Sequence, residues 1–301
     1  MNQTLLPAEV IVADSGLNAD ISRRVKEVSD CAAGLANVKY VVIRDVHAGN
    51  ERNIAATHCT SKWIAFLDDD DEWYPEKVAK QMSSIPVGAS MVVSAYDIED
   101  EGKVTSFHPK RELVESPTAI LGENVLGCTS MQVVSKKAFD EVGGFDPRFR
   151  ANQEWDLWMR LHRKGKYHLV DEVVGKKHVG KNTISSNPVR RMKGWSDMIR
   201  YHFKEYVGHP EQFARVMWFV TMDNVRFRHR IRAVLSFSFY CALSVASKVV
   251  KAVSSRRRHR FCSLVVEIRH LGELLLEALD GRHGFGVDAA LLRHPHGQVV
   301  A

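Results

Sequence analysis

Short apolar segments alternate with amphipathic ones over roughly the first 170 residues, and this alternation restricts the chain to a sheet covered by helices. The apolar segments, such as Val10-Ile-Val12, run on without polar interruption, which is typical of strands buried on both faces of a parallel sheet. We therefore predict an α/β fold with a mainly parallel sheet sandwiched by helices. The predicted strands cover residues 9–13, 38–43, 63–67 and 90–95, and the predicted helices cover 21–32, 50–59 and 75–83.

Strand patterns end near residue 188, and the remainder has the spacing of amphipathic helices. We divide the chain into a first domain over 1–187, a basic helical extension over 188–280, and a Gly- and His-rich tail over 281–301 that we expect to be disordered. The predicted helices of the extension cover 191–206, 210–227, 231–253 and 262–279.

The composition indicates an ordinary globular protein. Hydrophobic residues make up 45% and charged residues 26% of the 301 residues, which excludes disordered, collagen-like and disulfide-scaffold classes. The five cysteines are scattered without a C-x-x-C pair, so zinc clusters and disulfide frameworks are excluded as well. We expect a reducing cytoplasmic location.

A row of carboxylates follows one predicted strand directly. Residues 63–67 are apolar, and Asp68, Asp69, Asp70, Asp71 and Glu72 come next. A run of acids is often only a solvated loop. At the carboxyl end of a strand, however, α/β sheets bind their ligands, and adjacent carboxylates repel one another unless a cation lies between them. The sequence therefore predicts a site for a hard divalent cation, which prefers oxygen ligands.

The segment Phe66-Leu-Asp-Asp-Asp-Asp-Glu-Trp73 resembles the D-x-D region of family 2 glycosyltransferases, which have the Rossmann-like GT-A fold. Further blocks follow in that family's order and extend the resemblance over roughly residues 3 to 185. These blocks are Glu9-Val-Ile-Val-Ala-Asp-Ser-Gly16, Gly49-Asn-Glu-Arg-Asn53, Val142-Gly-Gly-Phe-Asp146 and Gln153-Glu-Trp-Asp-Leu-Trp-Met-Arg160.

The resemblance implies roles for residues on the donor side. Asp14 matches an aspartate that contacts the nucleotide base, and Arg52 matches an arginine near the nucleotide. Asp68 and Asp69 are expected to bind the nucleotide sugar, and Asp70 the metal ion. His178 matches a further metal ligand and would favour Mn²⁺ over Mg²⁺. A lone histidine is usually not a ligand, and for His178 the two interpretations stay open.

The resemblance also implies the position of the catalytic base. Glu154 stands where the family has the aspartate that deprotonates the acceptor hydroxyl, and Gln153 replaces the acid before it. Asp156 is the second candidate, with a structural role as the favoured alternative. Trp155 and Trp158 are expected in the core rather than as a sugar platform.

The function implied is a metal-dependent, inverting glycosyltransferase that uses a nucleotide diphosphate sugar, with UDP-sugars favoured, and a glycan or lipid-linked acceptor. Cell-surface polysaccharide or lipopolysaccharide synthesis is the pathway that the family suggests. A non-catalytic, glycosyltransferase-like binding or scaffold protein is the main alternative, and an aspartyl phosphatase is a weaker one, because Asp68 lacks a following Thr or Ser.

The beginning of the chain departs from the family pattern. The family opens with a further strand and helix, whereas Met1-Asn-Gln-Thr4 corresponds to the end of that helix. We expect a start codon further upstream; a truncated gene and a partner strand that fills the gap are the alternatives.

A basic segment accounts for the net charge of +6. Residues 226–260 hold ten lysines and arginines and no acid. The uncharged residues 233–247 are too few to span a membrane, so their helix either docks on the first domain or lies on anionic lipid at the inner face of the membrane. The arginines lack the interleaved aromatic residues of a nucleic-acid module, and no nucleic-acid partner is expected.

Overall fold

The computed structural model describes residues 2–14, 16, 18–32, 37–44, 47–83, 85–180 and 187–254, with side chains described up to Ser247 in the last helix. The chain divides into a first unit, Met1–Asn187, and a second unit, Pro188–Ala301. Ser15, the predicted helix over 262–279 and the tail over 281–301 lie outside the described residues.

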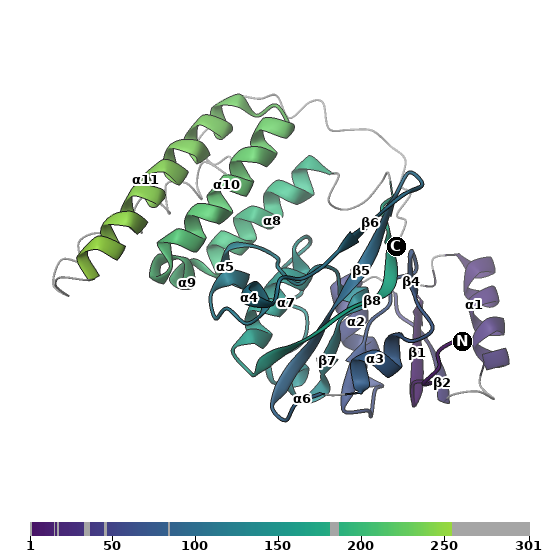
Figure 1. The fold of residues 1–301 in the computed structure, drawn as a ribbon. Coiled ribbons are helices and arrows are strands. Elements are labelled where there is room, and N and C mark those ends of the chain that lie inside the picture. Colours follow the sequence, from purple (N-terminus) through teal and green to yellow (C-terminus); the bar gives the residue numbers. More distant parts are fainter. Residues whose placement is uncertain are drawn as a thin grey trace, which may run out of the picture. The chain divides into compact units, whose positions relative to one another are not determined.

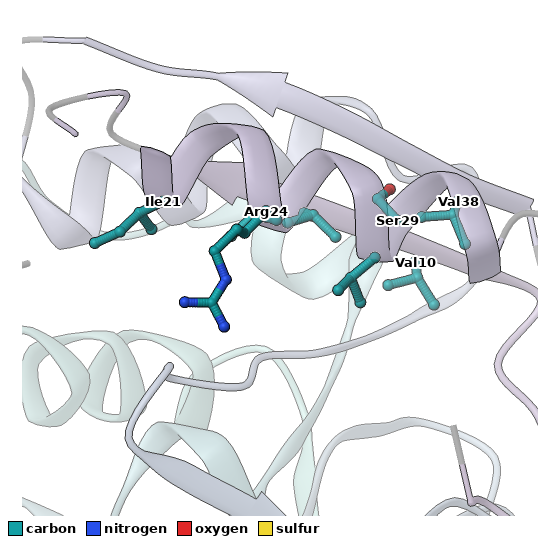
Figure 2. Close-up of a pocket in the computed structure, with 8 residues that line it drawn as sticks. Val10, Ile21, Arg24, Ser29 and Val38 are labelled. Atoms are coloured by element: carbon teal, nitrogen blue, oxygen red, sulfur yellow. The ribbon is translucent and has the colours of Figure 1, made fainter. Parts of the chain in front are cut away.

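The first unit begins with a small parallel sheet. Strand β1 (Glu9–Asp14) pairs in parallel with β2 (Asn37–Val42), and helix α1 (Ala19–Ala32) connects them. Valines from both strands and the inner side of α1 line an apolar cavity of about 470 Å³ (Figure 2). The predicted strands over 9–13 and 38–43 are therefore present, in parallel pairing.

The main sheet of the first unit has six strands in the order β3-β7-β5-β8-β4, with β6 paired to β5 (Figure 1). Four of the five strand pairings of this sheet in the described residues are antiparallel, so the sheet is mixed rather than mainly parallel. Strands β4, β6 and β7 have only three to five residues each, and such short segments give no apolar run in the sequence. The strands are β3 (Trp63–Ala65), β4 (Asp71–Trp73), β5 (Ala89–Asp100), β6 (Lys103–Phe107), β7 (Val133–Ser135) and β8 (Lys166–His178).

The core of this unit lies along β5 and the long helix α7 (Gln153–His162). Met91, Val92 and Val93 of β5 are fully buried, as are Leu157 and Trp158 of α7. The expectation that both α7 tryptophans belong to the core is confirmed, because Trp155 is also buried. The remaining helices are α2 (Ala48–Thr57), α3 (Lys77–Met82), α4 (Arg111–Val114), α5 (Ala119–Gly122), the 3₁₀ turn η1 (Thr129–Met131) and α6 (Lys136–Glu141).

A carboxylate connects the small sheet to the chain entering the large one. Oε1 of Glu9, at the start of β1, accepts hydrogen bonds from the backbone N–H groups of Thr60 and Ser61, both at 2.7 Å. Burial raises the pKa of Glu9, but these bonds and the two hydroxyls outweigh it and lower the pKa to about 2. In the described residues β1 pairs only with β2, and β3 only with β7, so each strand has one open edge.

The second unit consists of helices in its described part. Helices α10 and α11 pack side by side (Figure 1), and Thr221 of α10 donates a hydrogen bond to Ser236 of α11 at 3.1 Å. The predicted helix over 191–206 is two helices, which break at His202. Within the residues that the structure describes, no helix is both long and apolar enough to cross a membrane. The helices are α8 (Pro188–Tyr201), α9 (Phe203–Gly208), α10 (Pro210–Arg226) and α11 (Arg230–Ser254).

Candidate active site

A tight turn between β3 and β4 gathers three carboxylates. The backbone N–H of Asp71 donates to the carbonyl oxygen of Asp68 at 3.2 Å, and this bond folds the acidic row back on itself. As a result, one carboxylate oxygen each of Asp68, Asp70 and Asp71 lies within 4.8 Å of the others. Ser130 of η1 holds the turn in place, since its hydroxyl accepts a hydrogen bond from the backbone N–H of Asp68 at 3.1 Å.

The donor set of this turn fits a divalent cation. Asp71 is buried, and its Oδ2 atom has no hydrogen-bond partner, which is costly for a carboxylate unless a cation completes its shell. Burial raises the pKa of Asp71, although Ser130 and Lys177 oppose the shift. Three carboxylate oxygens at this spacing match the ligand preference of Mg²⁺ and Mn²⁺.

Lys177 brings a positive charge to the same turn. It lies opposite Asp71 in the register of β4 and β8. Burial alone would lower the pKa of Lys177, but Cys128 and the three clustered aspartates favour the ammonium form, and the pKa is raised. The ammonium group of Lys177 therefore places a positive charge beside the aspartates of this turn.

Two residues proposed for the donor and metal sites lie beside the cluster. Asp69 is exposed on the turn and is not one of the three converging carboxylates. The ring of His178 turns to other acids, with Nε2 at 3.2 Å from Glu72 and Nδ1 at 3.7 Å from Glu99. Only the backbone N–H of His178 reaches the cluster, donating to Oδ1 of Asp71 at 3.2 Å.

Helix α2 places Arg52 against the acidic turn. Nη2 of Arg52 donates to Oδ1 of Asp68 at 2.5 Å, and its guanidinium lies 5.5 Å from the centre of the Phe145 ring. The preceding residue, Glu51, has a pKa raised by burial and by the charges of Asp14 and Asp69, while Arg52 opposes the shift. The first turn of α2 thus lies between the end of β1 and the acidic turn.

The same helix is joined to the Gly143-Gly144 turn through Asn53. The amide of Asn53 donates to the carbonyl oxygen of Phe145 and accepts the N–H of Phe145, each at 2.7 Å. Gly144 has φ +68°, and a Cβ there would lie 2.4 Å from Oδ1 of Asn53. Glycine is therefore required here both for the backbone conformation and for the approach of the amide.

The first turn of α7 faces these groups from the other side. A Cβ on Gly49 would lie 2.9 Å from Oε1 of Gln153, so α7 begins in contact with α2. Burial raises the pKa of the next residue, Glu154, and Asp68 acts in the same direction, whereas Arg52 and Lys177 oppose it. Glu154 therefore interacts electrostatically with Asp68 of the aspartate cluster and with the cations Arg52 and Lys177.

Asp156 points elsewhere. Its carboxylate is only 2% exposed and accepts two hydrogen bonds from Arg160, at 3.0 and 2.5 Å. Arg160 in turn donates to the carbonyl oxygens of Val142 and Gly144. This geometry favours a structural role for Asp156, as a brace for the glycine turn.

Asp14 ends β1 with its carboxylate held in place. Oδ2 accepts from the hydroxyl of Tyr40 at 2.7 Å, and Oδ1 accepts the N–H of Gly16 at 3.1 Å. Burial raises the pKa of Asp14, but the hydrogen bonds to its carboxylate lower the pKa by more. The net pKa is below the usual value, and the carboxylate stays charged. The two bonds fix the orientation of the carboxylate at the end of the small sheet.

Sequence reasoning missed three participants. Asp71 was part of the acidic row, but nothing in the sequence signals that it starts a strand whose partner fixes it. Lys177 stands directly before His178, and only the pairing of β4 with β8 brings it to the aspartates. Ser130 belongs to a short 3₁₀ turn that has no sequence signature.

The fold and the acidic site define a protein of the GT-A glycosyltransferase class. Among solved structures, TarS residues 1–349 of S. aureus in complex with UDP matches with a TM-score of 0.56 at 12% identity, over 96% of this chain and 88% of that one. The mannosyltransferase PcManGT from Pyrobaculum calidifontis, in complex with GDP-Man and Mn²⁺, matches with a TM-score of 0.56 at 13% identity, over 93% of this chain and 78% of that one. The expected GT-A fold is therefore confirmed.

The family model described as glycosyl transferase family 2 matches residues 1–153, and the chain belongs to that family. An uncharacterized glycosyltransferase of Haemophilus influenzae is 24% identical over 55% of this chain and 59% of its own length, so the match spans less than two thirds of that relative. The amylovoran biosynthesis glycosyltransferase AmsB of Erwinia amylovora is 24% identical over 78% of this chain and 81% of its own. The beta-1,3-glucosyltransferase WfgD of Escherichia coli, whose name gives UDP-Glc and a diphosphoundecaprenol-linked sugar as substrates, is 22% identical over 66% of this chain and 76% of its own.

Proposed function

We propose that the protein transfers a sugar from a nucleotide diphosphate sugar to an acceptor hydroxyl, in a metal-dependent reaction that inverts the anomeric centre. One observation carries the proposal: three aspartates converge within 4.8 Å at a strand end, and one of them keeps a buried oxygen without a partner. Such a donor set is suited to the Mn²⁺ or Mg²⁺ that neutralises a diphosphate leaving group.

The residues of the site divide the work on the donor. Asp68, Asp70 and Asp71 would hold the metal ion, which would supply Lewis-acid chemistry at the diphosphate. Asp14 accepts hydrogen bonds from the nucleotide base, and Asp69, on the exposed part of the turn, is within reach of the donor's hydroxyl groups. His178 joins the metal ligands only if its ring leaves Glu72, so we assign it a secondary role.

Two cations orient the leaving group. Arg52 is fixed by Asp68 and by the face of Phe145, and Lys177 is held beside the aspartates by its strand register. Their positive charges stabilise the negative charge that grows on the diphosphate as the glycosidic bond breaks.

Glu154 serves as the general base in this proposal. Its burial raises its pKa above the usual value for a glutamate, which makes it a better proton acceptor for the acceptor hydroxyl. A base acting from the side opposite the leaving group gives inversion. Asp156 acts only through Arg160 and the glycine turn, as a positioning residue.

The relatives suggest the pathway and the substrates. AmsB is named for amylovoran biosynthesis, and WfgD for a UDP-sugar donor and a lipid-linked acceptor. By analogy we propose a UDP-sugar donor, a glycan or lipid-linked acceptor, and a role in cell-surface polysaccharide assembly at the inner face of the cytoplasmic membrane.

The proposal is tested by Asp70→Asn, assayed for Mn²⁺-dependent release of UDP from a panel of UDP-sugars. We expect a loss of activity of about 100-fold or more, because a charged ligand of the Lewis acid is removed. Glu76→Gln is the matched control, since Glu76 is exposed beside the same segment but outside the cluster. Equal activity of Asp70→Asn and the native chain would contradict the role of Asp70 as a metal ligand, whereas no activity of the native chain with any donor would favour the non-catalytic alternative.

A further inference from the structure

The α10–α11 hairpin of the second unit exposes large apolar side chains on a continuous face. Rings connect the two helices on this face, since Trp218 lies 5.4 Å from Tyr240 and Tyr240 lies 5.9 Å from Phe237, measured between ring centres. We call this surface the hairpin patch. Its exposed residues are Trp218, Met222 and Val225 of α10 and Ile231, Val234 and Phe237 of α11.

The exposed side of α11 lacks the charged side chains that a helix facing water normally carries. Residues 233–247 carry no charge, although Val234 is 65% exposed and lies well outside the contact with α10. The contact uses other positions, including Ser236 and Phe239, which meet Thr221 and Phe213 of α10. A contiguous apolar face of this kind marks an interaction surface.

Arginines gather at the turn that joins the two helices, next to the patch. Arg226 ends α10, Arg228 lies in the turn, and Arg230 begins α11, and all three are exposed. Arg232 follows two residues after Arg230, and no acidic residue occurs from 226 to 260. The occupant of the patch must therefore be apolar and bordered by negative charge.

We propose that the hairpin patch docks on the surface of an anionic lipid bilayer, with the apolar side chains among the upper acyl chains and the arginines at the headgroups. The uncharged part of α11 is about 22 Å long, shorter than a hydrocarbon core of about 30 Å, so the helix lies along the interface and does not cross it. Trp218 has the amphipathic ring that is favoured at this depth.

A second copy of the chain fits the patch less well. It would bring its own arginines toward this face, and like charges oppose such a contact. An anionic bilayer supplies both the apolar layer and the opposite charge. Its benefit, access to a lipid-linked acceptor, rests on the proposed function, but the docking itself requires no catalysis.

Flotation of the full chain with vesicles tests the proposal. We expect binding to vesicles of phosphatidylcholine with phosphatidylglycerol, and little to phosphatidylcholine alone. Val225→Gln/Val234→Gln should lower the bound fraction at least about tenfold, because two apolar groups no longer enter the bilayer. Arg226→Gln/Arg230→Gln should lower it by about twenty- to thirtyfold, since each arginine near an anionic surface contributes about fivefold.

Matched controls separate the patch from general effects. Val28→Gln/Val189→Gln replaces two helical valines that are 69% and 70% exposed, and Arg111→Gln/Lys137→Gln removes two charges from the first unit, and both should float like the native chain. Failure of the native chain to float, or unchanged flotation of Val225→Gln/Val234→Gln, overturns the proposal. A dimer in sedimentation that this variant converts to a monomer, without vesicle binding, would assign the patch to a second copy instead.

The readouts keep the two proposals apart. UDP release from a soluble donor should be unchanged in the Val225→Gln/Val234→Gln variant, and flotation should be unchanged in Asp70→Asn. Loss of one therefore leaves the other standing.

Discussion

Each aspartate of the acidic row has a different environment, and the differences decide its role. Asp71 is buried at the start of β4, Asp68 is paired with Arg52, and Asp69 and Asp70 are exposed on the turn. Of four identical side chains in a row, one is thus buried in the sheet, one is oriented by an ion pair, and two meet solvent.

Glu154 yields a prediction about pH. Burial raises the pKa of Glu154 above the 4.5 of a free glutamate. As the pH falls through this raised pKa, the base becomes protonated and kcat/KM decreases. Glu154→Gln should lower kcat by about 100-fold or more and remove this acid limb, as measured by pH–rate profiles in the presence of Mn²⁺.

Asp156→Asn is the comparison for that experiment. It should lower the free energy of unfolding, because Arg160 loses its buried partner, while the acid limb of the pH profile stays in place. If the acid limb persists in Glu154→Gln and disappears in Asp156→Asn, Asp156 is the general base and Glu154 is not.

The sequence was sufficient to locate these residues but not to distinguish them. The order of the motif blocks placed Asp14, Arg52, Asp68 and Glu154 on one site, and the structure brings Arg52 to Asp68 and Glu154 within electrostatic range of both. The orientation of a ring such as that of His178 depends on which acids surround it. Those acids, Glu72 and Glu99, come from two other strands, and no local pattern reveals them.

Among the elements, the glycine turn after α6 joins helix α2 to helix α7. Asn53 of α2 holds Phe145 through two hydrogen bonds, and Arg160 of α7 holds the carbonyl oxygen of Gly144. Helices that are about a hundred residues apart in the chain therefore share one turn.

Gly144→Ala should be more destabilising than Gly143→Ala. Both residues have positive φ, +68° and +78°, so each substitution carries a backbone cost of about 1 kcal/mol. Only at Gly144 does the added Cβ meet Asn53, at 2.4 Å, and we expect a total of about 3 kcal/mol there. Urea unfolding of the two variants measures the difference. Equal losses in the free energy of unfolding would show that the close approach of Asn53 to Gly144 contributes nothing.

Prediction succeeded where a segment has an apolar run or helical spacing of its own, even one as short as β3, and failed where a strand is formed by pairing with distant segments. The strands over 9–13, 38–43 and 90–95 and the helices over 21–32 and 210–227 all exist, because their apolar periodicity is set by burial of whole faces. Strands β4, β6 and β7 are formed by pairing with distant segments, and β4 even consists of Asp71, Glu72 and Trp73, two of which are acidic. Their antiparallel pairing made the sheet mixed.

For the whole molecule, charge is distributed unevenly between the units. Acidic side chains converge in the first unit, where a cation is expected, and arginines gather on the hairpin of the second. A divalent ion should therefore stabilise the first unit alone.

Hydrogen exchange measured with and without Mn²⁺ tests that expectation. At about a hundredfold excess over its Kd, an ion that binds only the folded form contributes about 2.7 kcal/mol. Peptides covering β4 and β8 should exchange more slowly with Mn²⁺, whereas peptides from α10 should not change. Asp71→Asn should abolish the protection, and protection spread equally over α10 would contradict a local site.

The placement of Asp70 and Asp71 has a kinetic consequence. Asp71 is anchored in the sheet through its pairing with Lys177, while Asp70 stands one residue away on a solvent-facing turn. If an ion binds here, Asp71 would offer it a fixed carboxylate and Asp70 a more mobile one, so a movement of the turn would release the ion with the strands left intact. Under the proposed function, release of the ion together with the spent nucleotide would then need no unfolding of the sheet.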